Sequence, residues 1–238
     1  MNTYTLESML TVLLLGVAVA VVHMMFQLGV SVLTLLSGHS LGAHKAHLRL
    51  LHLNASYIIG VYTTIVLVTL GLLTLTNVIG LSDHVLWLLT TVVAAVVGCA
   101  VCLVYYRRGK GTVLWLPRSI AEYLSKRAKK TKHGVEAAAL GGMTVIAELP
   151  FLIAPLLIVS LLLKTESQQY QLGALLAYAF LVVIPLLVVT TLIGAGHRLS
   201  TIQRWREDNK SFLQYSGGLG LIVIALYLTV FRIVGVSL

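Results

Sequence analysis

The sequence predicts an all-α, polytopic membrane protein with six transmembrane helices. Of its 238 residues, 58% are hydrophobic and 11% are charged, whereas a soluble domain carries about 25% charged residues. Uncharged runs of about 20 residues recur, and a helix of that length crosses the hydrocarbon core. These runs lack the alternation of barrel strands, and a backbone in lipid must satisfy its own hydrogen bonds. We therefore expect helices throughout.

Six apolar runs are the expected spans, and each is rich in Leu, Val, Ile, Ala and Gly. The first run is too long for the core of a cleaved signal peptide, and the first basic residue, Lys45, follows it. We therefore expect this run to be a membrane span. The six spans are expected at residues 9–36, 55–77, 85–106, 137–163, 172–194 and 216–234.

Lysine and arginine are concentrated in alternate gaps between the spans. The first, third and fifth gaps hold two, nine and four of the 17 cations, whereas the opposite side carries Lys164 beside Asp83 and Glu166. The positive-inside rule then places these three gaps in the cytoplasm and both termini outside. The net charge of +9 reflects this orientation, not binding to nucleic acid. We expect an integral protein of a prokaryotic cytoplasmic (inner) membrane.

The third gap, residues 107–136, is expected to be a basic cytoplasmic linker. Its segment LPRSIAEYLSKRAKKTKH places Ile120, Tyr123 and Leu124 on one side of a helix. This pattern is typical of an amphipathic helix on the inner leaflet. A solvated linker that only fixes the topology explains the same residues. In either case the basic gaps attract anionic lipids.

The linker divides the chain into two sets of three spans, residues 1–106 and 137–238. Because three is an odd number, the second set must cross the membrane in the opposite sense to the first. A shift of 125 residues aligns HMMFQLGVSVLTLL, from His23, with ELPFLIAPLLIVSL, from Glu148, and pairs Phe26 with Phe151. Inverted repeats are a common plan of secondary transporters, with the binding site where the repeats meet.

A Gly-rich basic turn follows the first span, prolines occur in the fourth, and the chain approaches its end with RWREDNKSFLQYSGGLGLIVIALYL. Together with the three-plus-three layout, these features resemble the LysE transporter superfamily. The resemblance implies a compact bundle that moves a small solute, a metal ion or reducing equivalents. Related CcdA-type electron carriers place one redox cysteine in span one and its partner in span four, and this chain has no cysteine in either span.

Glu148 is the first candidate for a binding residue. A carboxylate near the centre of an apolar span costs about 2.5 to 3.5 kcal/mol on insertion scales and usually faces a partner or a cavity. Pro150 and Pro155 follow it, and each proline removes a helical hydrogen bond, so nearby carbonyls could bind a cation or solute. The alternative is a protonated Glu148 that only holds helices together.

His23 and Gln27 lie one helical turn apart in the first span and would meet Glu148 if spans one and four pack together. A His and Glu pair can exchange a proton, which suits proton-coupled transport. A satisfied structural histidine is the alternative for His23. Tyr62 and Tyr178 either line a pathway or form hydrogen bonds between helices.

Two further groups are weaker candidates. His44 and His47, in GHSLGAHKAHLRLLHLN, could share a divalent metal ion, although interfacial histidines in a basic loop explain them as well. Cys99 and Cys102 form a C-x-x-C spacing inside the third span, where thiols one turn apart close a disulfide with difficulty. They are either packing residues or a redox or soft-metal pair.

The chain carries no P-loop, no nucleophile elbow, no HExxH motif and no dinucleotide fingerprint, so we do not expect an enzyme. The expected function is a secondary transporter, an exporter of a small solute or cation such as a divalent metal ion or an amino-acid-like molecule. Proton coupling and homo-oligomerisation stay open, and no cofactor is required. The alternative is a non-transporting membrane component, either a CcdA-like thiol or electron carrier or an assembly subunit.

Overall fold

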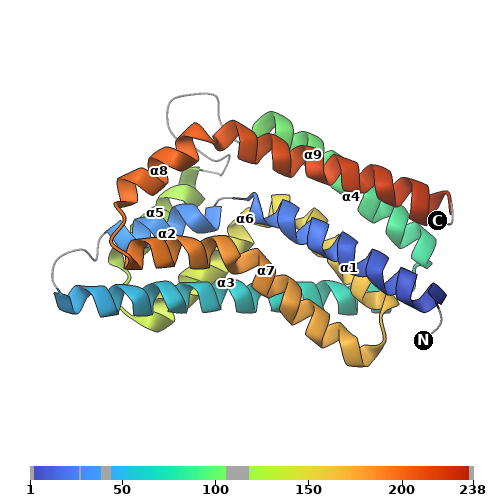
Figure 1. Cartoon of the computed structure of the whole chain (residues 1–238), viewed down its shortest axis with the longest axis horizontal. Coiled ribbons are helices and arrows are strands. Elements are labelled where there is room, and N and C mark those ends of the chain that lie inside the picture. The colour runs from blue at the N-terminus through green and yellow to red at the C-terminus, as the bar shows by residue number, and fades with distance from the viewer. Residues whose placement is uncertain (1–2, 27, 39–43, 106–117, 236–238) are drawn as a thin grey trace.

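The computed structural model describes residues 3–26, 28–38, 44–105 and 118–235, and within these ranges every regular element is a helix (Figure 1). The prediction of an all-helical chain is therefore confirmed for this part of the protein. The elements are α1 (Thr3–Met24), α2 (Leu28–Gly38), α3 (His44–Val78), α4 (Asp83–Val104), α5 (Arg118–Lys130), α6 (Gly134–Thr165), α7 (Gln168–Gly194), α8 (Leu199–Asp208), α9 (Lys210–Leu228) and a short π-helix η1 (Thr229–Ile233).

Five helices in the described ranges are long and apolar enough to cross a membrane: α3, α4, α6, α7 and α9 continued by η1. The pair α1 and α2 makes a sixth if the two helices form one bent span. Several long apolar helices in one chain indicate an integral membrane protein.

The first span is not the continuous helix expected over residues 9–36. α1 and α2 meet at an angle of 48° around residues 25–27, and Gln27 lies outside the described residues. The last turn of α1 closes early, because Met25 and Phe26 donate their backbone N–H groups to carbonyls three residues back. The N–H of Leu28 then donates to the side chain of Glu148 in α6. An acceptor from another helix thus replaces the intrahelical one at the break.

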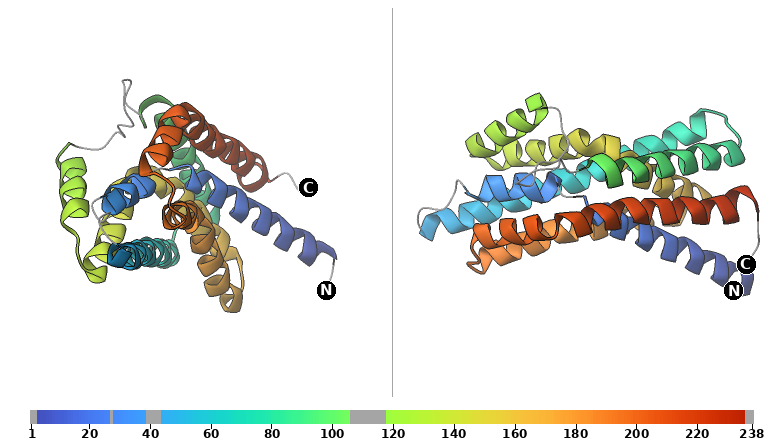
Figure 2. Two further views of the ribbon diagram at one scale, coloured as in Figure 1. Left: turned by 60° about the vertical axis from the view of Figure 1, so that its left-hand side comes forward. Right: turned by 90° about the horizontal axis from the view of Figure 1, so that it is seen from above.

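Two helix pairs pack closely through glycine. α3 runs along α6, where Gly60 lies against the backbone of Ala138 and Gly141 lies against that of Tyr57 (Figures 1 and 2). α4 runs along α9, where a Cβ on Gly98 would lie 2.8 Å from the carbonyl oxygen of Gly218. Small residues allow membrane helices to approach and gain van der Waals contact, which lipid tails would otherwise supply.

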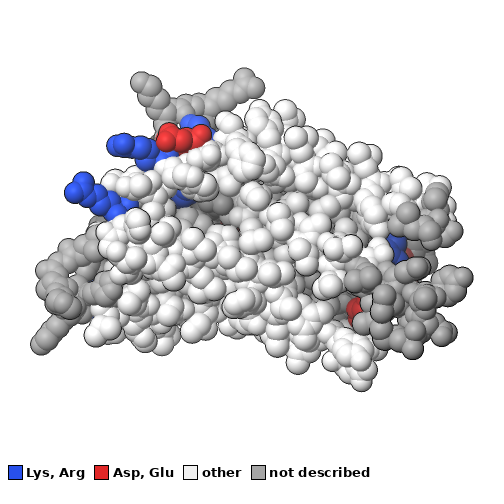
Figure 3. Space-filling model, in the orientation of Figure 1, with Lys and Arg blue, Asp and Glu red and all other residues white. Residues whose placement is uncertain are grey.

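The two ends of the bundle differ in charge. On the face in Figure 3, lysine and arginine gather at the end formed by α5 and α8. α1 begins and η1 ends at the opposite end (Figure 1). There Lys164 and Asp83 form an ion pair of 2.7 Å between α6 and α4. The bundle thus has a basic end and an end that carries the two chain termini.

Helix α5 rests on the protein through Leu124 and Ala128, which are buried where α5 packs against α2 and α6. Ile120 and Tyr123 are exposed. The expectation that Ile120, Tyr123 and Leu124 share one lipid-facing side is therefore wrong for Leu124, because its side chain fills the space between α5 and the bundle.

Glycine packing between α3 and α6 gives a stability prediction. We expect Gly60→Ala to destabilise the protein by about 1 to 3 kcal/mol, because the added methyl group meets the carbonyl of Ala138. Gly71→Ala, in the same helix, meets nothing within 4 Å and should be neutral or slightly stabilising. Unfolding of the two purified variants in detergent tests this difference, and equal stabilities would contradict the close packing of α3 on α6.

Candidate functional site

A small cavity lies at the break between α1 and α2, near the middle of α3, α6 and α7. The cavity has a volume of about 40 Å³, which is room for a few water molecules. Its polar side chains are those of His23, Thr144 and Glu148, and the rest of the lining is apolar side chains and Gly29. Side chains that are far apart in the sequence therefore share one buried polar space.

Glu148 is held at the start of α2. Its side chain is 5% exposed, and its Oε1 accepts hydrogen bonds from the Leu28 N–H at 3.2 Å and from the Tyr105 hydroxyl at 2.5 Å. The first turn of a helix presents free N–H groups and the positive end of the helix dipole. Both features favour a carboxylate at this place.

His23 occupies the last turn of α1 and is 4% exposed. Its Nδ1 lies 2.7 Å from the hydroxyl of Tyr178 in α7. Either the tyrosine donates to a bare ring nitrogen or the ring N–H donates to the tyrosine oxygen. This contact ties the end of α1 to α7, whereas Glu148 ties the start of α2 to α6.

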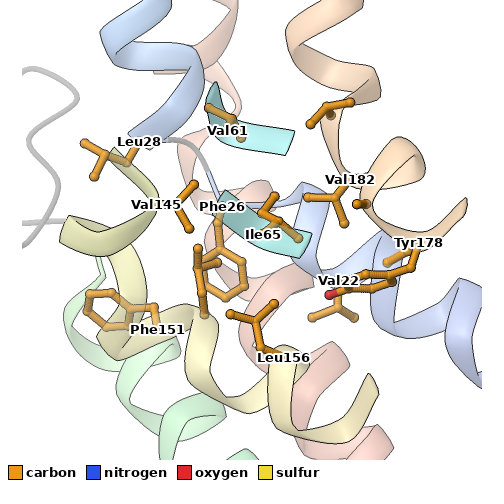
Figure 4. Packing of buried hydrophobic residues seen from close by; sticks show 14 of the residues in the cluster. Val22, Phe26, Leu28, Val61, Ile65, Val145, Phe151, Leu156, Tyr178 and Val182 are labelled. Atoms are coloured by element: carbon orange, nitrogen blue, oxygen red, sulfur yellow. The ribbon is translucent and has the colours of Figure 1, made fainter. Parts of the chain in front are cut away.

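Aromatic rings pack around Tyr105, whose hydroxyl donates to Glu148. Phe26 and Phe151 both meet the ring of Tyr105 edge to face, with centroid distances of 5.4 and 5.1 Å. Figure 4 shows Phe26 projecting into the buried cluster near Ile65 and Val145. The two phenylalanines that the shift of 125 residues aligns thus lie on one ring, which orients the Tyr105 hydroxyl.

Tyr57 fixes the other side of the break. Its side chain is fully buried in α3, and its hydroxyl donates to the carbonyl of Gly29 at 3.1 Å. That carbonyl lies in the first turn of α2. α2 is thus held by donors and acceptors from α3 and α6 at its first two residues.

The structure brings some predicted site residues together and separates others. His23 and Glu148 line the same cavity, and Tyr178 contacts His23. Tyr62 lies elsewhere between α3 and α7, where its hydroxyl is 3.4 Å from the carbonyl oxygen of Leu176. The role of each residue in binding stays a prediction.

Pro150 and Pro155 do not interrupt α6, which stays helical across both. Pro150 is exposed and Pro155 is buried, and neither lines the cavity. An irregular stretch of backbone lies instead between α1 and α2. Glu148 supplies the acceptor that makes the break there stable.

Neither cysteine lines the cavity. The side chains of His44 and His47, at the start of α3, lie outside the described part of the structure, and the residues that are described contain no group of three metal-binding side chains. Cys99 is exposed and Cys102 is partly buried, both as free thiols in α4. Gly218 of α9 lies against Cys102, which agrees with a packing role for that thiol.

Tyr105 and Tyr57 are the site residues that sequence reasoning missed. In the sequence, Tyr105 lies at the end of the third apolar run, next to Tyr106 and the basic linker, where a tyrosine at the membrane interface is ordinary. Only the packing of α4 against α6 brings its hydroxyl to Glu148. Only its position within an apolar run could have pointed to Tyr57. The chain has ten tyrosines, so a tyrosine alone does not identify a site residue.

No protein-family model, curated protein or solved structure matches this chain.

The hydroxyl of Tyr105 gives a second stability prediction. We expect Tyr105→Phe to cost about 1.5 to 3 kcal/mol, because it removes a donor to a carboxylate but keeps the ring between Phe26 and Phe151. Tyr62→Phe removes only a long, exposed hydrogen bond and should change stability by less than about 0.5 kcal/mol. Denaturant unfolding in micelles measures both, and a Tyr105→Phe protein as stable as the parent would contradict the contact.

Proposed function

We propose that the protein is a secondary transporter that exports a small solute or cation through the cavity at the α1–α2 break. The observation that carries the proposal is the placement of Glu148 and His23 in one buried space lined by α1, α2, α3, α6 and α7. Buried ionisable residues between membrane helices commonly mark substrate or proton pathways.

The broken first span supports this function. Many secondary transporters bind their substrates at discontinuous helices, whose half-helix ends supply dipoles and free backbone groups. Here the start of α2 meets a carboxylate, and the end of α1 carries His23. A solute with both a positive and a polar group would find complementary partners in this space.

The contacts between helices support an inverted repeat. In an inverted repeat, each span of the first half has a counterpart in the second half. The counterpart of the α1–α2 pair is α6, that of α3 is α7, and that of α4 is α9. The contact of α3 with α6 then becomes that of α7 with α1 and α2, and the contact of α4 with α6 becomes that of α9 with α1. All of these pairs touch, as a two-fold exchange requires. This repeat, the outward termini and membership of the LysE superfamily belong to the proposal.

The hydrogen-bond partners of Glu148 support the proposal of proton coupling. The Leu28 N–H and the Tyr105 hydroxyl both donate to Oε1, an arrangement that favours the carboxylate. Protonation would weaken both contacts and loosen α2 from α6. A proton and a cationic solute would then compete for the same oxygen, which is the requirement for exchange of one against the other.

Transport by purified protein in liposomes tests the proposal. The panel contains divalent cations, amino acids and organic cations, each with and without a pH gradient. We expect a transported solute whose rate falls by about tenfold or more in Glu148→Gln and in His23→Ala, since both remove a cavity group.

His84→Ala is the matched control, because His84 is an exposed residue of α4 outside the cavity. It should transport as the parent does. If Glu148→Gln and His23→Ala retain the full rate for every transported solute, the proposed site is wrong.

The thiols separate this function from the redox alternative. A transporter that works through the cavity should keep its full rate in Cys102→Ser, since Cys102 lies against α9 and not in the cavity. A thiol carrier would lose its activity in the same variant. Thiol exchange across the liposome membrane, measured with a trapped disulfide reporter, tests the second outcome directly.

A further inference from the structure

A second, larger groove is lined by residues of α1, the end of α6 and the start of α7. The start of α1 and the turn from α6 into α7 lie at the same end of the bundle (Figures 1 and 2). The groove has a volume of about 650 Å³, which is far larger than that of the central cavity. Its walls are apolar, and small residues make the space: Gly16 of α1 and Gly173 of α7 have no atom within 4 Å of where a Cβ would lie. The volume is that of a site for a drug-sized molecule.

The mouth of the groove is acidic and aromatic. Glu166, Gln169 and Tyr170 line it at the turn from α6 into α7. Lys164, the cation nearest in sequence, is held by Asp83 at 2.7 Å, and no salt bridge to Glu166 occurs within the part of the chain that the structure describes. The Tyr170 ring is 54% exposed. A carboxylate beside an open aromatic ring attracts organic cations by charge and by cation–π contact.

The inner end of the groove reaches the central site. Tyr178 lines the groove and is itself 6% exposed. Its hydroxyl is 2.7 Å from Nδ1 of His23, which lines the central cavity. The linings of the two spaces therefore meet at the contact between Tyr178 and His23.

We propose that the groove binds an amphipathic organic cation, with its apolar body between α1 and α7 and its positive charge at Glu166 and Tyr170. The inference rests on the proposed function, since it assigns a substrate class to the transporter. The apolar walls exclude small hydrated ions, and the carboxylate at the mouth disfavours anions. The contact of Tyr178 with His23 joins the lining of the groove to that of the central cavity, so a bound cation would lie next to the site that holds Glu148.

Binding of tetraphenylphosphonium to the full-length protein in phosphatidylcholine nanodiscs tests the inference, with empty nanodiscs as the blank. We expect saturable binding that weakens about five- to tenfold in Glu166→Gln, because the charge partner is lost. Glu166→Asp should restore most of the affinity. Tetraphenylborate, of similar size and opposite charge, should not compete.

A second pair of variants tests the location. Gly173→Leu should weaken binding by about tenfold or more, because its side chain fills the groove. Gly71→Leu, at another open glycine in α3 that does not line the groove, should bind as the parent does. A normal melting temperature for Gly173→Leu shows that any loss of binding is not a loss of folding.

Two results would overturn the inference. Equal binding by the parent and Glu166→Gln would mean that the carboxylate does not recognise the cation. The groove would instead be a site for lipid chains if tetraphenylborate competes with tetraphenylphosphonium. Displacement of tetraphenylphosphonium by added phospholipid alone would mean the same.

The liposome assay keeps the two proposals apart. Binding of the cation without transport of any solute would retain the groove and overturn the transporter. Transport of another solute that depends on Glu148, without binding of the cation, would overturn the groove alone.

Discussion

The hydrogen bond from the Leu28 N–H to the Glu148 carboxylate is the contact on which the centre of the molecule depends. A helix that stops inside a membrane leaves backbone donors without partners, and each buried unpaired group costs several kcal/mol. A carboxylate in the same place needs donors for the same reason. The Leu28 N–H and the Glu148 carboxylate therefore stabilise each other. Without this hydrogen bond, each would need another partner within the apolar bundle.

This contact also explains how much of the site could be predicted from the sequence. Glu148 and His23 stand out because an ionisable residue in an apolar run is rare and costly, which is a local signal. The break in the first span gave no such signal, since no proline or glycine lies at residues 25–27. The acceptor that permits the break comes from 120 residues further along the chain. The prolines of α6 leave that helix continuous, and their part in binding stays a prediction.

The helices themselves were predictable because length and apolar composition decide whether a segment can cross a bilayer. Which helices pack against one another could not be predicted in this way. The hydroxyl of Tyr105 meets Glu148 only because α4 packs on both α6 and α9, and Gly98 and Gly218 let α4 approach α9. Such contacts depend on crossing geometry, which no single apolar run encodes. The burial of Leu124 under α5 is a further example.

The volumes of the central cavity and the groove indicate where the protein must move if it transports a solute. The central cavity holds only a few waters, whereas the groove between α1 and α7 is about 650 Å³. A solute that fits the groove can reach Glu148 only if α1 and α7 separate around the Tyr178 and His23 contact. α1 packs on α6, α7 and α9, whereas α2 packs on α3, α5, α6, α7 and α8, so the two helices have largely different neighbours. If the protein transports, we therefore expect α1 to move relative to α2 at the angle between these two helices, next to the site that holds Glu148.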